Sequence, residues 1–140
     1  MANTFIHFEL NTDDVSNAQA FYKKLFKWKF APMKGMPYTM IDTGSKVGGA
    51  GLQKKPMPEA PSSWLAYVEV DDVRKTIGQA RDAGAQVVLE YQPIPEMGAF
   101  GIFTDPAGAM LGLWERAKPV KKPKKKPAKK AKKAKKKGKR

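Results

Sequence analysis

One order of predicted elements occurs twice in this sequence, with a spacing of 58 residues. The tripeptide Asp-Asp-Val stands at residues 13–15 and again at 71–73. Each copy follows a segment with the apolar, alternating character of a β-strand, at 5–10 and at 64–70. Each copy also precedes a run whose apolar residues recur at helical spacing, with Asp as the N-cap. Such a repeat favours a fold built from two similar modules.

Short strands follow each predicted helix and complete two βαβββ units. The first helix is expected over roughly 14–27, and the second runs from Val73 to its end at Gly84. We therefore expect an α+β fold in which two modules, at about 4–53 and 63–116, form a cup-shaped mixed sheet. The strands expected after the helices cover 28–30, 38–41, 47–52, 86–90, 99–104 and 110–114. The first helix should bury one apolar stripe made of Val15, Ala18, Phe21, Tyr22, Leu25 and Phe26.

Basic residues are concentrated at the carboxyl end. Residues 117–140 contain 14 Lys and Arg140 but no acidic residue, whereas residues 1–116 hold 12 basic and 13 acidic residues, a formal charge of −1. The body at 1–116 is expected to fold as one domain, and the tail at 117–140, with almost no apolar surface, to be disordered. The tail resembles linker-histone tails in composition, which suggests sequence-nonspecific contact with the phosphates of nucleic acid. The residues expected to make this contact are Lys121, Lys122, Lys124, Lys125, Lys126, Lys129, Lys130, Lys132, Lys133, Lys135, Lys136, Lys137, Lys139 and Arg140.

Other roles are open for this Lys-rich segment. The same composition fits a solubility tail, a nuclear-import signal in a eukaryotic host, or adhesion to an anionic membrane. Membrane adhesion is the least favoured of these because the segment has no apolar anchor. The composition does not distinguish DNA from RNA or from another polyanion.

The remaining composition bears on the compartment. There is no Cys, so disulfides and thiol chemistry are excluded. The N-terminal residues lack the pattern of an export signal, and no apolar run approaches the length of a membrane span. We expect a soluble, cytoplasmic protein, nucleoid-associated if the tail binds DNA, or nuclear in a eukaryote.

Three segments resemble one protein superfamily. They are HFELNTDDVSNAQAFYKKLFKWKF at 7–30, YVEVDDVRKTIGQARDAGAQVV at 67–88 and MGAFGIFTDPAGAMLGLWE at 97–115. Their combination resembles the vicinal-oxygen-chelate superfamily, which includes glyoxalase, bleomycin-resistance and extradiol-dioxygenase proteins. The resemblance covers about residues 4–116. It implies paired βαβββ modules around a small-molecule cavity, and often a homodimer.

The same resemblance implies where a metal would bind. In catalytic members, the first strand of each module and the last strand of each supply one ligand. The first-strand positions here are His7 and Leu65, and the last-strand position of the second module is Gly112. The first module has no His, Asp or Glu within residues 43–58, and Glu115 should point to the opposite face from Gly112. Since His7 alone can bind a metal, we expect no metal site and no other cofactor.

Strand alternation predicts which side chains line the cup. If His7 points into it, then Ile6, Phe8 and Leu10 should face the helix. The expected substrate-binding residues are Phe5, His7, Glu9, Leu65, Tyr67, Met110 and Trp114, with Trp28, Tyr38 and Met40 as further candidates. The turn at 93–98 is a candidate lid. This mostly apolar and aromatic set is typical of a small-molecule pocket.

The sequence does not identify catalytic residues. His7 and Glu9 share one face, so they could form a proton shuttle in which the carboxylate raises the pKa of His7. The favoured alternative is a hydrogen-bonded histidine left at a former ligand position. The function expected first is a metal-free small-molecule-binding protein held on nucleic acid by its tail. The alternatives are an active, metal-dependent enzyme, such as a lactoylglutathione-lyase-like isomerase or a dioxygenase, and a structural nucleoid protein whose body dimerises.

Overall fold

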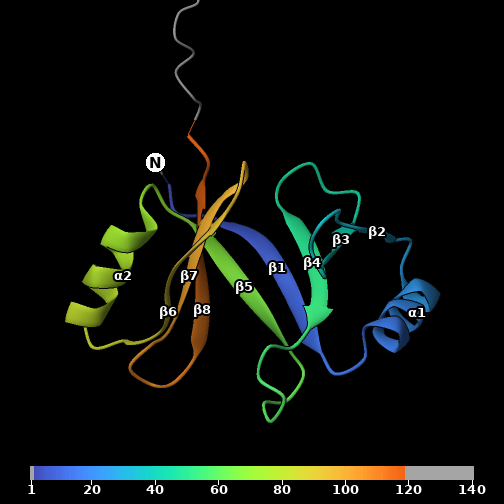
Figure 1. The fold of residues 1–140 in the computed structure, drawn as a ribbon, viewed down its shortest axis with the longest axis horizontal. Coiled ribbons are helices and arrows are strands. Elements are labelled where there is room, and N and C mark those ends of the chain that lie inside the picture. The colour runs from blue at the N-terminus through green and yellow to red at the C-terminus, as the bar shows by residue number, and fades with distance from the viewer. Residues whose placement is uncertain (1, 119–140) are drawn as a thin grey trace, which may run out of the picture.

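The computed structural model of the chain describes residues 2–118, and it contains one eight-stranded sheet with the order β2-β3-β4-β1-β5-β8-β7-β6 (Figure 1). A helix lies near each end of this sheet, α1 beside the β2–β4 half and α2 beside the β6–β8 half (Figure 1). The elements in chain order are β1 (Phe5–Thr12), α1 (Val15–Leu25), β2 (Lys29–Pro32), β3 (Thr39–Asp42), β4 (Gly49–Lys54), β5 (Ser63–Glu69), α2 (Val73–Asp82), β6 (Gln86–Ile94), β7 (Gly98–Thr104) and β8 (Met110–Arg116).

The two βαβββ modules are related as the repeat predicts. β1 pairs in parallel with β4, and β5 pairs in parallel with β8. The modules join where β1 and β5 run antiparallel, with Phe8 opposite Ala66, its counterpart 58 residues later. The predicted mixed α+β fold is confirmed for residues 2–118. The expected nucleic-acid contacts, Lys121 to Arg140, lie outside the described residues.

Asp14 and Asp72 start the two helices, as predicted from the repeat. The Asp14 carboxylate accepts a hydrogen bond from the Asn17 backbone N–H at 3.0 Å, and Asp72 does the same for Lys75 at 3.0 Å. Each carboxylate satisfies a backbone donor that the helix itself leaves free. These caps place the start of each helix at a defined distance from the preceding strand.

Each module has its own small core. Ile41 and Leu52 are central to the first, and Val73 and Ile77, both fully buried, to the second. The prediction of one buried stripe on α1 was wrong in part. Val15, Ala18 and Tyr22 pack on the first core, but Phe21, Leu25 and Phe26 are about half exposed. The helix therefore meets the sheet along a narrower line than its apolar residues suggested.

A β-bulge on β1 changes the expected alternation. Phe5 lies opposite Val68 and His7 lies opposite Tyr67, so Ile6 is an extra residue on β1. One extra residue reverses the facing of everything before it. Phe5 accordingly stacks on Phe8 at a centroid distance of 6.2 Å and is 57% exposed. The prediction that Phe5 enters the cup and Ile6 faces the helix was wrong for this reason.

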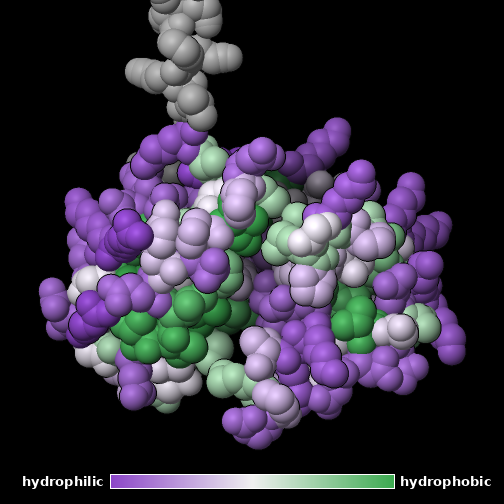
Figure 2. All heavy atoms as spheres, viewed as in Figure 1, coloured by the Kyte–Doolittle hydropathy of each residue, from purple (hydrophilic) through white to green (hydrophobic). Residues whose placement is uncertain are grey.

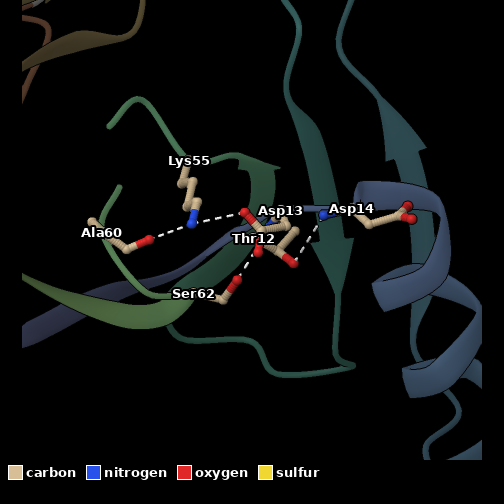
Figure 3. A network of polar contacts seen from close by, with 6 residues as sticks. All are labelled: Thr12, Asp13, Asp14, Lys55, Ala60 and Ser62. Carbon is tan, nitrogen blue, oxygen red and sulfur yellow. Dashed lines mark hydrogen bonds and ion pairs between the residues drawn. The ribbon is translucent and has the colours of Figure 1, made fainter. Parts of the chain in front are cut away.

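A polar network holds the connection between the modules (Figure 3). The Lys55 ammonium, whose side chain is 8% exposed, pairs with the Asp13 carboxylate at 2.7 Å and donates to the Ala60 carbonyl. The Ser62 hydroxyl accepts from the Asp13 backbone N–H at 3.1 Å. These contacts tie the linker after β4 to the start of α1 and so support the register of β5 on β1.

Apolar side chains remain on the surface. Figure 2 shows two hydrophobic groups on one face, a larger one over the α2 half and a smaller one over the α1 half. Phe8 and Trp64, on the paired strands β1 and β5, are 46% and 42% exposed.

Within residues 2–118, neither helix is long and apolar enough to cross a membrane.

Candidate functional site

A cavity of about 540 Å³, here called the central cavity, lies among strands of both modules. β1, β4, β5 and β8 form its base, and the β2–β3, β3–β4 and β6–β7 connections surround it. Figure 1 shows the β3–β4 loop and the β6–β7 hairpin rising at the same edge of the sheet. The lining residues are Ile6, His7, Glu9, Met33, Met36, Tyr38, Met40, Lys46, Val47, Gly48, Gly49, Gln53, Tyr67, Ile94, Met97, Phe100, Trp114 and Arg116.

Several residues singled out from the sequence meet in this cavity. They are His7, Glu9, Tyr38, Met40, Tyr67 and Trp114. The candidate lid at 93–98 also contributes, through Ile94 and Met97. Glu115 lies on the opposite face, as alternation predicts, and accepts from the Val73 backbone N–H at the start of α2 at 2.8 Å.

Four residues expected in the cup lie elsewhere. The bulge turns Phe5 away from the cup. Leu65 is only 6% exposed and does not line the cavity. Met110 begins β8, about 13 Å along the strand from Trp114, and is 45% exposed. Trp28 packs instead against Tyr22 of α1, with ring centroids 5.7 Å apart. The central cavity thus occupies one end of the cup rather than its whole length.

A buried carboxylate is the centre of the polar base. Glu9 is 7% exposed and has no ion-pair partner within residues 2–118. Its Oε1 accepts from the Tyr38 hydroxyl at 3.0 Å. Its Oε2 accepts from Asn11 at 3.1 Å, from Tyr67 at 3.3 Å and, more weakly, from Gln53 at 3.4 Å. Burial raises the pKa of Glu9, and the hydrogen bonds from Asn11, Tyr38 and Tyr67 oppose that rise.

Tyr38 joins this carboxylate to the only histidine. Its hydroxyl oxygen lies 2.8 Å from His7 Nε2. Burial lowers the pKa of His7, which is opposite to the shift expected in the proton-shuttle alternative, and the Tyr38 hydroxyl stands between the ring and the Glu9 carboxylate. Burial, followed by the charge of Glu9, raises the pKa of both Tyr38 and Tyr67. Both phenols therefore stay protonated and can donate.

Two glycines make room for the tyrosines. A Cβ on Gly51 would lie 1.9 Å from the Tyr38 hydroxyl oxygen, and a Cβ on Gly112 would lie 2.5 Å from the Tyr67 ring. Gly51 pairs with Glu9, and Gly112 pairs with Tyr67, the residue 58 positions after Glu9. The glycines are therefore equivalent positions on the last strands of the two modules.

Gly112 is the position where the resemblance places the last-strand metal ligand of the second module, and strand pairing makes Gly51 its equivalent in the first. A tyrosine side chain fills the space that a ligand side chain would need at Gly112 and at Gly51. At the two first-strand positions, His7 Nε2 is hydrogen-bonded to Tyr38, and Leu65 has no atom that could coordinate a metal. No group of three His, Cys, Asp or Glu side chains within residues 2–118 could hold a metal ion. The residues present do not fit the divalent ion that the resemblance implies for catalytic members of the superfamily.

Sequence reasoning missed part of the cavity walls. Met33 and Met36 come from the β2–β3 connection, and Phe100 comes from β7. Arg116, at the end of β8, lines the rim while its guanidinium donates to Glu69 at 2.5 Å. Strand alternation could have indicated Phe100, but alternation gives no information about side chains on loops.

Replacing Glu9 by Gln should change how stability depends on pH. Between the ordinary glutamate pKa of about 4.3 and the raised pKa in the folded protein, the folded state holds a proton that the unfolded state has released. The contribution of Glu9 to the free energy of unfolding of the wild type therefore falls as pH rises through this window. E9Q lacks this titration, so the stability of the wild type relative to E9Q should decrease with rising pH in urea unfolding. Exposed Glu59→Gln is the control, and parallel pH curves for wild type and E9Q would contradict the expectation.

The sequence model of the Glyoxalase/Bleomycin resistance protein/Dioxygenase superfamily matches residues 4–113. The chain belongs to this superfamily. Superfamily membership accounts for the paired βαβββ modules.

Curated relatives include two longer proteins. The chain is 36% identical over 117 residues to "Putative glyoxylase CFP32" of Mycobacterium tuberculosis (strain CDC 1551 / Oshkosh), a match that covers 81% of this chain and 44% of that protein. It is 25% identical over 125 residues to the anthracycline biosynthesis protein DnrV of Streptomyces peucetius, covering 78% and 46%. The chain thus spans less than half the length of these relatives.

Solved structures share the superfamily fold. Methylmalonyl-CoA epimerase from Mycobacterium tuberculosis has a TM-score of 0.61 at 12% identity, over 82% of this chain and 89% of that one. Hypothetical protein BH1468 from Bacillus halodurans C-125 has a TM-score of 0.62 at 12% identity, over 87% and 100%. At this identity the likeness concerns the fold alone.

Proposed function

We propose that the chain binds a small, partly apolar molecule in the central cavity and holds it without a resident metal ion. The observation that carries this proposal is the combination of an apolar wall with a buried polar base around Glu9. Concave sites of a few hundred Å³ with a few converging polar groups are the usual form of small-molecule sites. The tyrosines over Gly51 and Gly112 support binding without the metal ion that the resemblance implies for catalytic members of the superfamily.

A metabolite screen by thermal shift tests this proposal. Ligands of the central cavity should raise the melting temperature of the wild type, because binding to the folded state stabilises it. Met36→Lys places a charge in the cavity wall and should abolish these shifts. Met57→Lys, at a half-exposed methionine outside the cavity, should preserve them. Equal shifts in both variants would contradict the assignment of the cavity, and one tightly held divalent ion per purified chain would contradict metal-free binding.

We further propose that the Lys-rich segment tethers the protein to nucleic acid. The 15 basic residues of 117–140, with no acidic residue among them, support contact with phosphates. If all engage duplex DNA, the slope of log affinity against log salt should approach roughly −13. A chain truncated after Arg116 should lose this binding at about 150 mM salt. Affinity retained by the truncated chain would assign DNA binding to the body instead.

We also propose that two copies associate through the apolar surface beside β1 and β5. The half-exposed aromatic side chains of Phe5, Phe8 and Trp64 support this proposal, because contiguous exposed apolar patches mark association sites. Light scattering of the wild type should give the mass of a dimer. Phe8→Lys should give that of a monomer, and an unchanged mass would place the interface elsewhere.

A further inference from the structure

We infer that the central cavity recognises a flat aromatic molecule that presents one uncharged hydrogen-bond donor, a hydroxyl or a ring N–H, to Glu9. This inference rests on the proposed small-molecule binding and names the chemical class of the ligand. Three features of the cavity support it: the acceptor atoms left open beside Glu9 and His7, the charges around them, and the aromatic and methionine side chains of the walls.

The base of the cavity offers acceptors. Each carboxylate oxygen can accept two hydrogen bonds. Oε2 of Glu9 receives donors from Asn11, Tyr67 and Gln53, whereas Oε1 receives only Tyr38 within residues 2–118. Glu9 is 93% buried and lines the cavity, so Oε1 retains acceptor capacity that water reaches poorly. A ligand donor placed there would satisfy it.

His7 adds a second acceptor. The single proton of the Tyr38 hydroxyl goes to Glu9, so Tyr38 accepts from His7 Nε2. In a neutral ring the other nitrogen, Nδ1, then carries a lone pair. Nδ1 lies 3.8 Å from the position of a Cβ on Gly49, which is part of the cavity wall. Among the contacts of residues 2–118, the two sites left open at the base, Glu9 Oε1 and His7 Nδ1, therefore accept, and neither donates.

The charged side chains of the cavity favour a ligand with a neutral donor over a charged ligand. An anionic group at the base would face the Glu9 carboxylate without a compensating cation. An ammonium group would meet that carboxylate, but four donors already stabilise its charge. The cation would also pass the exposed Lys46, whereas the Arg116 guanidinium is already paired with Glu69. The arrangement thus favours an uncharged hydroxyl or N–H.

The walls favour a flat aromatic body. Tyr67 and Phe100 meet edge to face with centroids 6.0 Å apart, and Trp114 lines the same side. Met33, Met36 and Met97 line the cavity from the connections. Thioethers adapt their shape and make favourable contacts with aromatic rings. Aromatic faces and methionines together match a planar ring system better than an extended aliphatic chain.

A matched ligand series on the full-length protein tests the inference. The probes are 2-naphthol, 2-methoxynaphthalene, 2-naphthoate and 2-naphthylmethylammonium, titrated by ligand-observed NMR at about 0.3 M salt, which weakens contacts with the tail. We expect 2-naphthol to bind at least about tenfold tighter than its methyl ether, the loss that follows removal of a donor to a charged acceptor. Both ions should bind more weakly than 2-naphthol. In Glu9→Gln the preference for 2-naphthol over its ether should disappear, whereas Glu59→Gln should retain it.

The affinities of the four probes for the wild type test the ligand class even if Glu9→Gln does not fold. Equal affinities of 2-naphthol and its ether overturn the inference. Tightest binding of the ammonium or the naphthoate also overturns it and assigns a charged ligand. If no naphthalene binds while the metabolite screen yields ligands blocked by Met36→Lys, the class is wrong and the proposed function stands. If neither experiment yields a ligand, both fail.

Discussion

Replacing Gly98 by Ala should destabilise the fold by on the order of 4 kcal/mol or more. A Cβ at this position would lie 2.0 Å from the Glu115 carbonyl oxygen and 2.8 Å from the Trp114 ring. The obstacle nearest to it is backbone, which a change of rotamer cannot remove. The φ of 151° adds strain for any L side chain. Urea unfolding followed by tryptophan fluorescence measures the loss.

Gly108→Ala is the matched control for this substitution. Gly108 also has a positive φ, 99°, but a Cβ there meets no atom within 4 Å. It should therefore cost only the conformational penalty, about 1–2 kcal/mol. Similar unfolding midpoints for the two variants would show that the approach of β7 to β8 at Gly98 is looser than the structure indicates.

Gly51→Ala should remove most of the ligand affinity of the central cavity while leaving the chain folded. The new methyl group would occupy the place of the Tyr38 hydroxyl, so the phenol must leave. His7 and Glu9 then lose their shared partner. A donor lost to a buried charged group costs roughly 1–3 kcal/mol in stability. We expect at least about a tenfold loss of affinity for ligands from the metabolite screen, measured by NMR titration.

Gly49→Ala tests whether this effect is local. Gly49 lies on the same strand and lines the same cavity, but its Cβ would contact His7 Nδ1 at an ordinary 3.8 Å. It should therefore change affinity far less than Gly51→Ala. Equal effects, or wild-type affinity in Gly51→Ala, would contradict the role given to Tyr38.

Local patterns in the chain predicted much of this molecule. The capping aspartates Asp14 and Asp72 act within three residues, so their role could be recognised from spacing alone. Strand alternation placed His7, Glu9 and Tyr67 on the concave face, because side chains alternate along any regular strand. Alternation failed at Ile6, since a bulge depends on the pairing of β1 with β5 and leaves no mark in β1 alone.

The polar base of the cavity could not be predicted in this way. Tyr38 is 29 residues from Glu9, and Tyr67 is 58 residues from it, yet both hydroxyls donate to one carboxylate. Their convergence requires glycine at positions 51 and 112, on two further strands. The pKa of His7 likewise depends on burial, which neighbouring residues in the sequence do not reveal, so the shift expected in the proton-shuttle alternative had the wrong direction.

The sequence by itself determined the two-module architecture, the start of each helix and the concentration of positive charge at the carboxyl end. Each of these follows from neighbouring residues, through capping, periodicity or composition. Only the tertiary structure decided which side chains surround Glu9, how the tyrosines fill the last-strand positions, and where the cavity lies within the cup. Those properties depend on strand register and on removal from water, and both arise only when distant segments pack together.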